Sequence, residues 1–544
     1  MSTSLALLPS GKGFVLGTDR SLRYYDSEGK FVWGKVISSA AVALNFSQDG
    51  RWLVAAYLDG TIRWHRPNDG SEQLAFFPHA DKKRWVMWTP EGYYDASIGG
   101  EELIGWHLNQ GKEKEPNFIT NGQLYDVFYR PDIVQAKFRG DDISKLISIS
   151  ATEALKNPPP TLVFTKIPPN TKNITEQVCY KVISSGGGIG EVRLFHNGKL
   201  IKSDGFYREN IGKDSSIKIK LASMDSASIQ RELRDMVGAK NSLSSIASTA
   251  KKNDYEECQE IHVIPGENEI SVSAFNESNT VQSRLESTQF SADLKQPEPH
   301  LYVLSVGINR YNDSSVNLEF AVKDSNDFVS AIKSNLGVNF KSQNIHLFGL
   351  ADGAANKEGV QKAIQELSKK VKPWDTFILF VASHGVLIDN QYFIVTSGYN
   401  GSFNATNLIS SNEIVGMSTK IKSLTQLFIF DTCYAGGIDN IIRGLYDARM
   451  AVMAKKMGLH IFASAGSTQT ALDGYKGNGL FTHTLLKSVR DFKNTDLNRD
   501  DQISVFELGQ RAKKETMSIS KELGRPQSPN IINFGRDSIL FISK

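Results

Sequence analysis

Five short apolar runs between residues 301 and 466 constrain the fold of this chain more than any other feature of its 544 residues. They are LYVLSVGI (301–308), NIHLFGL (344–350), TFILFVAS (376–383), LTQLFIFD (424–431) and HIFASAG (460–466). Stretches with helical spacing lie between them, at 321–336, 359–371 and 441–457. Strands this apolar are buried on both faces, as in a parallel sheet that helices cover. We therefore predict an α/β domain over residues 300–544.

Two of these predicted strands run directly into residues that can perform covalent chemistry. The third run leads into His384-Gly385, and the fourth leads into Asp431-Thr432-Cys433. In open α/β sheets, ligands bind beyond the carboxyl ends of the strands. Cysteine attacks as a thiolate, and a neighbouring imidazole can create that thiolate by taking the proton. The sequence therefore predicts a nucleophilic site at this edge of the sheet.

Residues 301 to about 540 resemble the caspase and metacaspase clan of cysteine peptidases. The matching pieces stand in family order: VGINRY (306–311), FAVKDSNDF (320–328), ASHG (382–385), FDTCYAGG (430–437), ASAGSTQTALD (463–473) and GLFTHTLLKSV (479–489). A histidine about 50 residues before the nucleophilic cysteine fits the caspase arrangement. Here 49 positions separate the two residues. Each piece alone is a weak signal, whereas the combination is specific.

The resemblance implies a catalytic role for three residues. Cys433 matches the nucleophile, and His384 matches the general base that later protonates the leaving amine. The backbone N–H groups of Gly385 and Cys433 match the oxyanion hole, where charge develops on the scissile carbonyl. The clan uses a dyad, so no third carboxylate is expected. The implied activity is that of a cysteine endopeptidase acting on protein substrates.

The resemblance also implies a substrate pocket. Asp324 and Asp431 fall where metacaspases hold the acids that bind Arg or Lys before the cut, and two carboxylates favour a cationic side chain. Ser383 and Ser464 are expected to line the same cleft. Arg310 follows the first strand, roughly where a caspase-type arginine sits, so specificity for acidic or apolar residues is the alternative.

Each assignment has a structural alternative. A cysteine at a strand end is often a small buried residue, Asp431 can cap the turn after its strand, and Asp324 can be a solvated helix carboxylate. At the level of function, the alternatives are a binding scaffold with an inactive peptidase-like domain, and acyl transfer by the same dyad. The presence of both His384 and Cys433 favours the enzyme.

The first 110 residues carry a repeated pattern. The segments 19–26, 59–66 and 100–108 each place a polar turn before an alternating run with an aromatic residue. The aromatics Tyr24, Trp64 and Trp106 are 40 and then 42 residues apart, and a period of roughly 40–45 residues is typical of propeller blades. We expect blades that resemble degenerate WD repeats over 1–110, although two or three blades do not close a propeller.

Residues 111–160 are predicted to be a connector, and 161–295 an immunoglobulin-like β-sandwich. Within the sandwich, Asn197-Gly198 predicts a tight hairpin turn, because Asn-Gly accepts positive φ. Residues 202–258 are not sandwich-like and are expected to form a long insertion. The expected fold is thus multidomain: a partial propeller, a sandwich and an α/β peptidase domain, in that order.

Composition excludes several other classes. The 62 basic and 59 acidic residues nearly balance, which gives no reason to expect nucleic-acid binding. No run reaches the roughly 20 apolar residues of a membrane span, and the first residues lack the features of a secretory signal. The three cysteines, Cys179, Cys258 and Cys433, form no close pair, so neither a zinc site nor a disulfide framework is expected. We expect a cytoplasmic protein.

One segment matches calcium-loop spacing. Residues 496–507 place oxygen-bearing side chains at positions 1, 3, 5, 7, 9 and 12, although position 6 is Asp501 in place of the usual glycine. Ser504 and Glu507 also form a capping box for the following helix, which is the favoured interpretation. No cofactor is expected to be required, and calcium is retained as an alternative because metacaspases are often calcium-activated.

Control of such a peptidase is expected through the N-terminal domains or through self-cleavage. Blades and sandwiches are common binding platforms, so we expect them to bind a regulatory protein, in a defence or cell-death pathway by resemblance to bacterial caspase-like proteins. If specificity is basic, accessible cleavage sites are expected in two segments. These are 438–456, with Arg443, Arg449, Lys455 and Lys456, and the insertion, with Arg231, Arg234, Lys240, Lys251 and Lys252.

Overall fold

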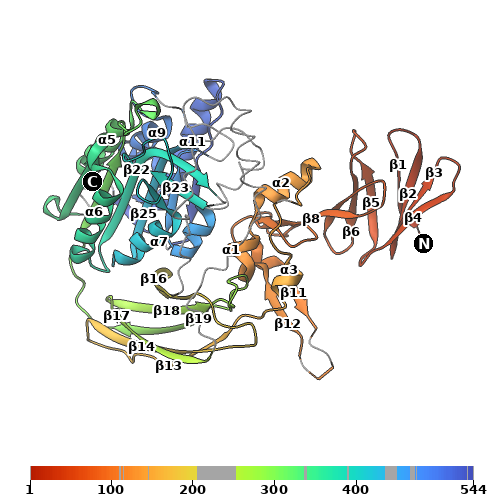
Figure 1. Cartoon of the computed structure of the whole chain (residues 1–544), viewed down its shortest axis with the longest axis horizontal. Coiled ribbons are helices and arrows are strands. Elements are labelled where there is room, and N and C mark those ends of the chain that lie inside the picture. The colour runs from red at the N-terminus through yellow and green to blue at the C-terminus, as the bar shows by residue number, and fades with distance from the viewer. Residues whose placement is uncertain are drawn as a thin grey trace. The chain divides into compact units, whose positions relative to one another are not determined.

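The computed structural model describes residues 2–542 apart from 110–111, 114, 145, 205–252, 336–339, 389–390, 435–449, 466–471, 473 and 536. The chain divides into two compact units, Met1–Lys156 and Asn157–Lys544, and Figure 1 shows the elements of each. Among the helices of the described residues, none has the length and apolar character needed to cross a membrane.

Antiparallel sheets make up most of the first unit (Figure 1). The strands β1 (Ser2–Leu7), β2 (Gly13–Thr18), β3 (Ser21–Asp26) and β4 (Phe31–Val36) form a four-stranded meander. Six further strands follow in a second sheet: β5 (Ala41–Phe46), β6 (Leu53–Tyr57), β7 (Ile62–His65), β8 (Glu72–Pro78), β9 (Trp85–Trp88) and β10 (Tyr94–Ala96). Buried side chains of both sheets form one core. Multiple sheets in this region were predicted, and their assignment as propeller blades stays a prediction.

Short elements complete the first unit. The strands β11 (Gly105–Leu108) and β12 (Asn117–Thr120) pair with each other, and three helices follow: α1 (Tyr125–Phe128), α2 (Pro131–Arg139) and α3 (Ala151–Ala154). The helix α2 has Pro131 in its first turn and ends at Gly140, whose φ is 84°. Proline at the start and glycine after the end are the usual boundary residues of a helix. The segment predicted as a connector thus contains both strand and helix.

The second unit begins with two sheets. The strands β13 (Thr161–Lys166), β14 (Thr175–Ile183) and β17 (Tyr255–His262) form one, and β15 (Val192–His196), β16 (Lys199–Asp204), β18 (Gly266–Ala274) and β19 (Glu286–Ala292) form the other. Buried residues from both sheets make a single cluster. We call residues 161–292 the two-sheet domain, and its immunoglobulin-like assignment stays a prediction. The hairpin turn at Asn197 and Gly198 has φ values of 50° and 81°, as predicted.

The expectation that the cysteines form no pair was wrong. Cys179 of β14 and Cys258 of β17 are directly opposed in neighbouring antiparallel strands and form a disulfide. They are 79 residues apart, so local spacing could not reveal the pairing. A disulfide gives no support to the expected cytoplasmic location, because disulfides persist mainly in oxidising compartments. Cys433 is the remaining cysteine of the chain.

A mixed α/β sheet forms the rest of the second unit, and this confirms the predicted fold class. Five parallel strands stand in the order β21-β20-β22-β25-β26, and β28 adds an antiparallel edge. Their bounds are β20 (Leu301–Gly307), β21 (Ile345–Ala351), β22 (Thr376–Ile388), β25 (Thr425–Tyr434), β26 (His460–Ala463) and β28 (Asn530–Asn533). The main helices are α5 (Ala321–Asn335), α6 (Lys357–Lys370), α7 (Ser411–Lys420), α9 (Leu480–Arg490) and α11 (Val505–Glu522).

Two of the parallel strands are longer than their apolar runs predict. The strand β22 continues beyond Ser383, because Gly385 to Ile388 pair with β23 (Gln391–Val395) in an antiparallel ladder. The strand β25 likewise continues to Tyr434, opposite Gly385. The backbone pairing therefore extends through the positions predicted to carry the chemistry, and it places them within strands instead of beyond them.

Candidate active site

His384 and Cys433 lie side by side in the backbone of two neighbouring strands. They are partners in the register of the parallel pair β22 and β25, as are Ala382 and Asp431 two residues earlier. Neighbouring strands of a sheet lie about 4.8 Å apart. The sheet thus brings together two residues that are 49 positions apart in the sequence. The structure describes the backbone of Cys433 and not its side chain.

The imidazole of His384 is held by one hydrogen bond. Its Nε2 lies 2.8 Å from the carbonyl oxygen of Val316, and because a carbonyl can only accept, Nε2 carries the hydrogen. Among the described residues, Nδ1 is buried without a hydrogen-bond partner. Burial lowers the pKa of this imidazole below its usual 6.5. At neutral pH the ring is therefore uncharged, with its free lone pair on Nδ1.

Tyr311 holds the histidine from a second side. Its ring centroid lies 5.3 Å from that of His384, and its hydroxyl oxygen accepts the backbone N–H of His384 at 3.1 Å. Val316 and Tyr311 both belong to the segment between β20 and α5. The histidine is thus oriented by a segment that lies almost 70 residues earlier in the chain.

Gly385 is required at its position by close packing. A Cβ atom there would lie 2.9 Å from a ring carbon of Tyr392 and 3.1 Å from Oγ1 of Thr432. These contacts are tighter than a side chain tolerates, so substitution displaces β23 or β25. Close packing against Tyr392 and Thr432 therefore explains why a glycine follows His384.

The two predicted pocket acids converge on one glycine. A Cβ atom at Gly479 would lie 3.0 Å from Oδ2 of Asp431 and 3.2 Å from Oδ2 of Asp324. Asp324 is 3% exposed. Its oxygens accept the N–H of Gly479 at 3.1 Å and the Nδ2–H of Asn478 at 2.8 Å. Asp324 is therefore not a solvated helix carboxylate.

The second carboxyl, that of Asp431, lies beside the same glycine. Burial raises the pKa of this carboxyl above its usual value, and hydrogen bonds from Thr482 and Ser464 act against that rise. The hydroxyl of Thr482 donates to Oδ2 of Asp431. Since α9 begins at Leu480, the positive end of its dipole also lies close to both acids. The start of α9 thus holds two carboxylates near one point.

The other predicted pocket residues lie elsewhere or are already engaged. The Ser383 hydroxyl is buried and donates to the carbonyl oxygen of His384 at 3.2 Å. Ser464 is also buried, with its Oγ 3.5 Å from the carbonyl oxygen of Thr432, and it forms the hydrogen bond to Asp431 described above. Arg310 is exposed, and its backbone N–H donates to Asp352.

The loop 496–507 forms the predicted capping box. The Ser504 hydroxyl accepts the N–H of Glu507 at 3.2 Å, and Glu507 accepts the N–H of Ser504 at 3.0 Å. The other oxygen of Glu507 accepts the N–H of Leu497, and Asp496 accepts three further backbone N–H groups. Asp501 has a φ of 62°, the conformation that glycine provides at this position of calcium loops.

Within the described residues, the one close grouping of His, Cys, Asp and Glu ligand atoms is Cys179, Glu256 and Cys258. Both of its sulfur atoms belong to the disulfide. The residues of the loop 496–507 therefore do not form such a grouping, and calcium binding there stays a prediction.

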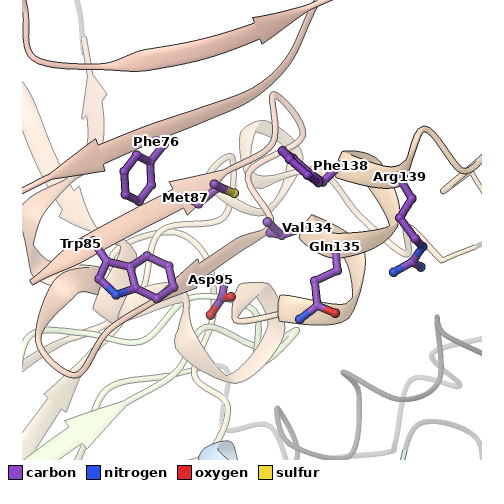
Figure 2. A pocket seen from close by; sticks show the side chains of 8 residues that line it. All are labelled: Phe76, Trp85, Met87, Asp95, Val134, Gln135, Phe138 and Arg139. Carbon is purple, nitrogen blue, oxygen red and sulfur yellow. The ribbon is translucent and has the colours of Figure 1, made fainter. Parts of the chain in front are cut away.

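A pocket of about 510 Å³ lies within the first unit. Figure 2 shows Phe76, Trp85 and Met87 from β8 and β9 on one side, and Val134 and Phe138 of α2 on the other. Its lining is mostly apolar. It contains neither His384 nor Cys433, so it is separate from the candidate active site.

Sequence reasoning missed four residues of the candidate site: Tyr311, Val316, Asn478 and Thr482. Tyr311 stands in the matching piece VGINRY, and Thr482 in GLFTHTLLKSV, so the motifs contained them without indicating a role. Val316 acts through its backbone carbonyl, and a backbone contact leaves no trace in side-chain chemistry. Asn478 has no motif context at all.

Residues 301–532 match the family model of the caspase domain, so the carboxyl-terminal part of the chain is caspase-like. No curated protein matches the chain. A structural-genomics target from Geobacter sulfurreducens is 17% identical with a TM-score of 0.32, over 45% of this chain and 97% of that one. BamB from Moraxella catarrhalis is 19% identical with a TM-score of 0.14, over 18% of this chain and 34% of its own length. Structural similarities this low carry no functional argument.

Proposed function

We propose that the protein is a cysteine endopeptidase whose nucleophile is Cys433 and whose base is His384. The observation that supports this most is the pairing of the two residues across adjacent strands. The imidazole of His384 is uncharged, and its Nδ1 has no hydrogen-bond partner within the described part of the chain. The caspase-domain match implies a peptidase fold and protein substrates.

The proposed reaction follows from this arrangement. Nδ1 of His384 takes the thiol proton of Cys433, and the thiolate sulfur attacks the scissile carbonyl carbon. The backbone N–H groups of Gly385 and Cys433 stabilise the oxyanion. The imidazolium then gives its proton to the leaving amine as the C–N bond breaks. Water, deprotonated by the same imidazole, hydrolyses the thioester and regenerates the thiol.

We propose that the substrate carries Arg or Lys before the cut. The convergence of Asp324 and Asp431 on Gly479 supports this preference, because paired carboxylates favour a cation over an anion. The exposed position of Arg310 gives less support to the acidic alternative. Ser383 and Ser464 then support the strand ends beside the pocket, and contact with substrate is not required of them.

Self-cleavage, which we retain as a proposal, cannot use all the predicted sites. Lys456 is 6% exposed and forms an ion pair with Glu191, so it is not accessible to an active site. Lys455 lies in the same helix as Lys456, so its backbone is held in helical hydrogen bonds and is not an extended cleavage site. Arg443, Arg449 and the five basic residues of the insertion lie outside the described residues. A regulatory protein bound by the N-terminal domains, a cytoplasmic location and a role in bacterial defence are likewise proposals.

A positional peptide library tests the proposed function. Wild-type protein and Cys433→Ala are compared, each with calcium and with a chelator. We expect cleavage after Arg and Lys by the wild type alone. A wild type that cleaves nothing, and that a peptidyl electrophile does not label at Cys433, would favour the inactive scaffold. Products joined to an added amine would instead indicate acyl transfer.

A further inference from the structure

A buried ion pair joins the two-sheet domain to the caspase-like domain. Glu191, which is fully buried at the start of β15, accepts from Nζ of Lys456 at 2.9 Å and 3.1 Å. Its second partner is Arg193 of β15, the strand that begins one residue after Glu191, at 2.9 Å. Lys456 belongs to the helix at 450–457, which precedes β26. A carboxylate of one domain thus holds a helix of the other.

A second lysine makes the reverse contact. Lys199 of β16 is 1% exposed, and its Nζ donates to the carbonyl oxygens of Ser418 at 2.8 Å and Ile421 at 3.4 Å. These carbonyls lie at the carboxyl end of α7, where helix carbonyls lack partners within the helix and a cation is favoured. Figure 1 shows β16 beside α7, and the two elements are in contact. The two-sheet domain therefore shares the end of α7 with Gln426, whose Nε2 also donates to these two carbonyls at 3.2 Å and 3.0 Å.

Close backbone packing joins the same surfaces at a third point. A Cβ atom at Gly458 would lie 1.8 Å from the carbonyl oxygen of Gly198, in the turn between β15 and β16. Gly458 ends the helix at 450–457 with a φ of 63°. No other residue fits this position. The hairpin turn is thus packed against the helix end and is not a loosely attached surface loop.

These contacts lie on both sides of the strand that carries the candidate nucleophile. The helix α7 leads into β25, which contains Cys433, and the helix at 450–457 leads into β26, the neighbour of β25. Lys199 therefore holds the end of α7 before β25, and Glu191 holds the helix at 450–457 before β26. A shift of either segment would alter the position of Cys433 relative to His384.

We propose that the two-sheet domain is part of the working peptidase, with Lys456 and Lys199 as positioning residues that hold the nucleophile strand in register. This inference rests on the proposed function, since it assigns a positioning role in that reaction. The two-sheet domain would then stabilise the active site of its own chain, in addition to binding the proposed regulatory partner. Displacement of a reacting group by about 1 Å can cost a hundredfold in rate.

The test compares Lys456→Met with Lys455→Met. Lys456→Met removes the contact between the domains and leaves Glu191 paired with Arg193. Lys455→Met removes the same charge one residue earlier, where the ammonium lies 5.9 Å from the ring of Phe534 within the caspase-like domain. The rate at which a peptidyl electrophile labels Cys433 is measured with kcat and KM, well below each variant's melting temperature. Lys456→Arg, which keeps the charge, is the rescue variant.

We expect labelling and kcat to fall at least tenfold in Lys456→Met, with little change in KM and partial recovery in Lys456→Arg. Should Lys456→Met fail to fold, Lys199→Met tests the second contact between the two domains. We expect the same fall in labelling and in kcat. If folded Lys456→Met or Lys199→Met labels as fast as Lys455→Met, the inference is wrong. An unlabelled wild type would instead refute the proposed function, so the two failures are distinguishable.

Discussion

At the scale of single residues, the candidate site depends on what each polar group contacts besides its proposed partner. The Val316 carbonyl determines which nitrogen of His384 carries the hydrogen. Thr482 donates to Asp431, and the backbone of Gly479 donates to Asp324. A histidine or an aspartate becomes chemically useful through these contacts, because they set its tautomer and its charge.

The pH dependence of the proposed reaction follows from the burial of His384. Because burial lowers its pKa below 6.5, the imidazole is still mostly uncharged at pH 6.5 and is protonated only on further acidification. We expect the acidic limb of the kcat/KM profile to have its midpoint below pH 6.5, measured with a peptide substrate. A midpoint above that value would contradict the assignment.

The hydroxyl of Thr482 is expected to tune the proposed pocket. Thr482→Val removes a donor from Asp431, so the pKa of this carboxyl, already raised by burial, rises further. Less carboxylate is then available for a cation at mildly acidic pH. A hydrogen bond to a charged group contributes about 1.5–3 kcal/mol, so KM for an arginine substrate should rise about tenfold at pH 6 and less at pH 8.

Thr484→Val is the matched control for that experiment. Thr484 lies in the same helix, and its hydroxyl donates to the carbonyl of Phe481 and contacts Thr516. It has no contact with either acid among those that the structure describes. Equal effects of the two substitutions would mean that Thr482 acts only through the stability of α9.

At the scale of elements, pairs of strands and the ends of helices bring the important residues together. The register of β22 and β25 sets His384 beside Cys433, and the start of α9 gathers Asp324 and Asp431. In the two-sheet domain, the register of β14 and β17 sets Cys179 opposite Cys258. In each case the pairing of strands or the start of a helix fixes the positions of the two residues relative to each other.

The disulfide between β14 and β17 is open to direct test. Thiol titration of the unfolded, unreduced protein should find one thiol per chain, since two of the three cysteines are paired. Reduction should raise the count to three. Because the bond closes a long loop, its reduction should lower the free energy of unfolding by about 2–4 kcal/mol. Cys179→Ser/Cys258→Ser should not respond to reductant.

The capping box at the start of α11 is a second element with a measurable effect. Ser504→Ala removes the acceptor for the N–H of Glu507, and loss of such a cap costs about 1 kcal/mol. Urea denaturation should show this decrease. No decrease would mean that the backbone contacts of Glu507 suffice to start the helix.

At the scale of the whole molecule, the chain divides after Lys156 and not at the linker before the caspase-like domain. The two-sheet domain and the caspase-like domain form one compact unit, joined by Glu191–Lys456 and by Lys199. The first unit has its own core and its own apolar pocket. The two-sheet domain therefore belongs to the same compact unit as the caspase-like domain, and residues 1–156 form a unit of their own.

Truncation should reveal the same division. We expect the fragment 157–544 to label at Cys433 as fast as the full chain, because it keeps both lysine contacts. The fragment 296–544 should label at least tenfold more slowly, since Lys456 loses Glu191 and the α7 carbonyls lose Lys199 and keep only Gln426. Equal labelling of the two fragments would show that the two-sheet domain is dispensable.

Much of the fold was predictable because it depends on local pattern. Apolar runs predicted the parallel strands, Asn197-Gly198 predicted its turn, and Ser504 with Glu507 predicted the start of α11. The caspase-like motifs also placed His384 and Cys433 on neighbouring strands. In contrast, β17 (Tyr255–His262) and its cysteine were missed, because Cys258 lies at the end of residues 202–258, which carry no sandwich pattern and were expected to form an insertion.

The amino-acid sequence by itself determined the class of the carboxyl-terminal domain and the residues that are candidates for its chemistry, since periodicity and motifs are properties of short segments. Only the tertiary structure decided the partner of Cys179, the convergence of Asp324 and Asp431 on Gly479, and the burial of Lys456 against Glu191. These contacts join residues tens to hundreds of positions apart. Such pairs form when separate elements pack, and packing depends on complementary surfaces that no short segment encodes alone.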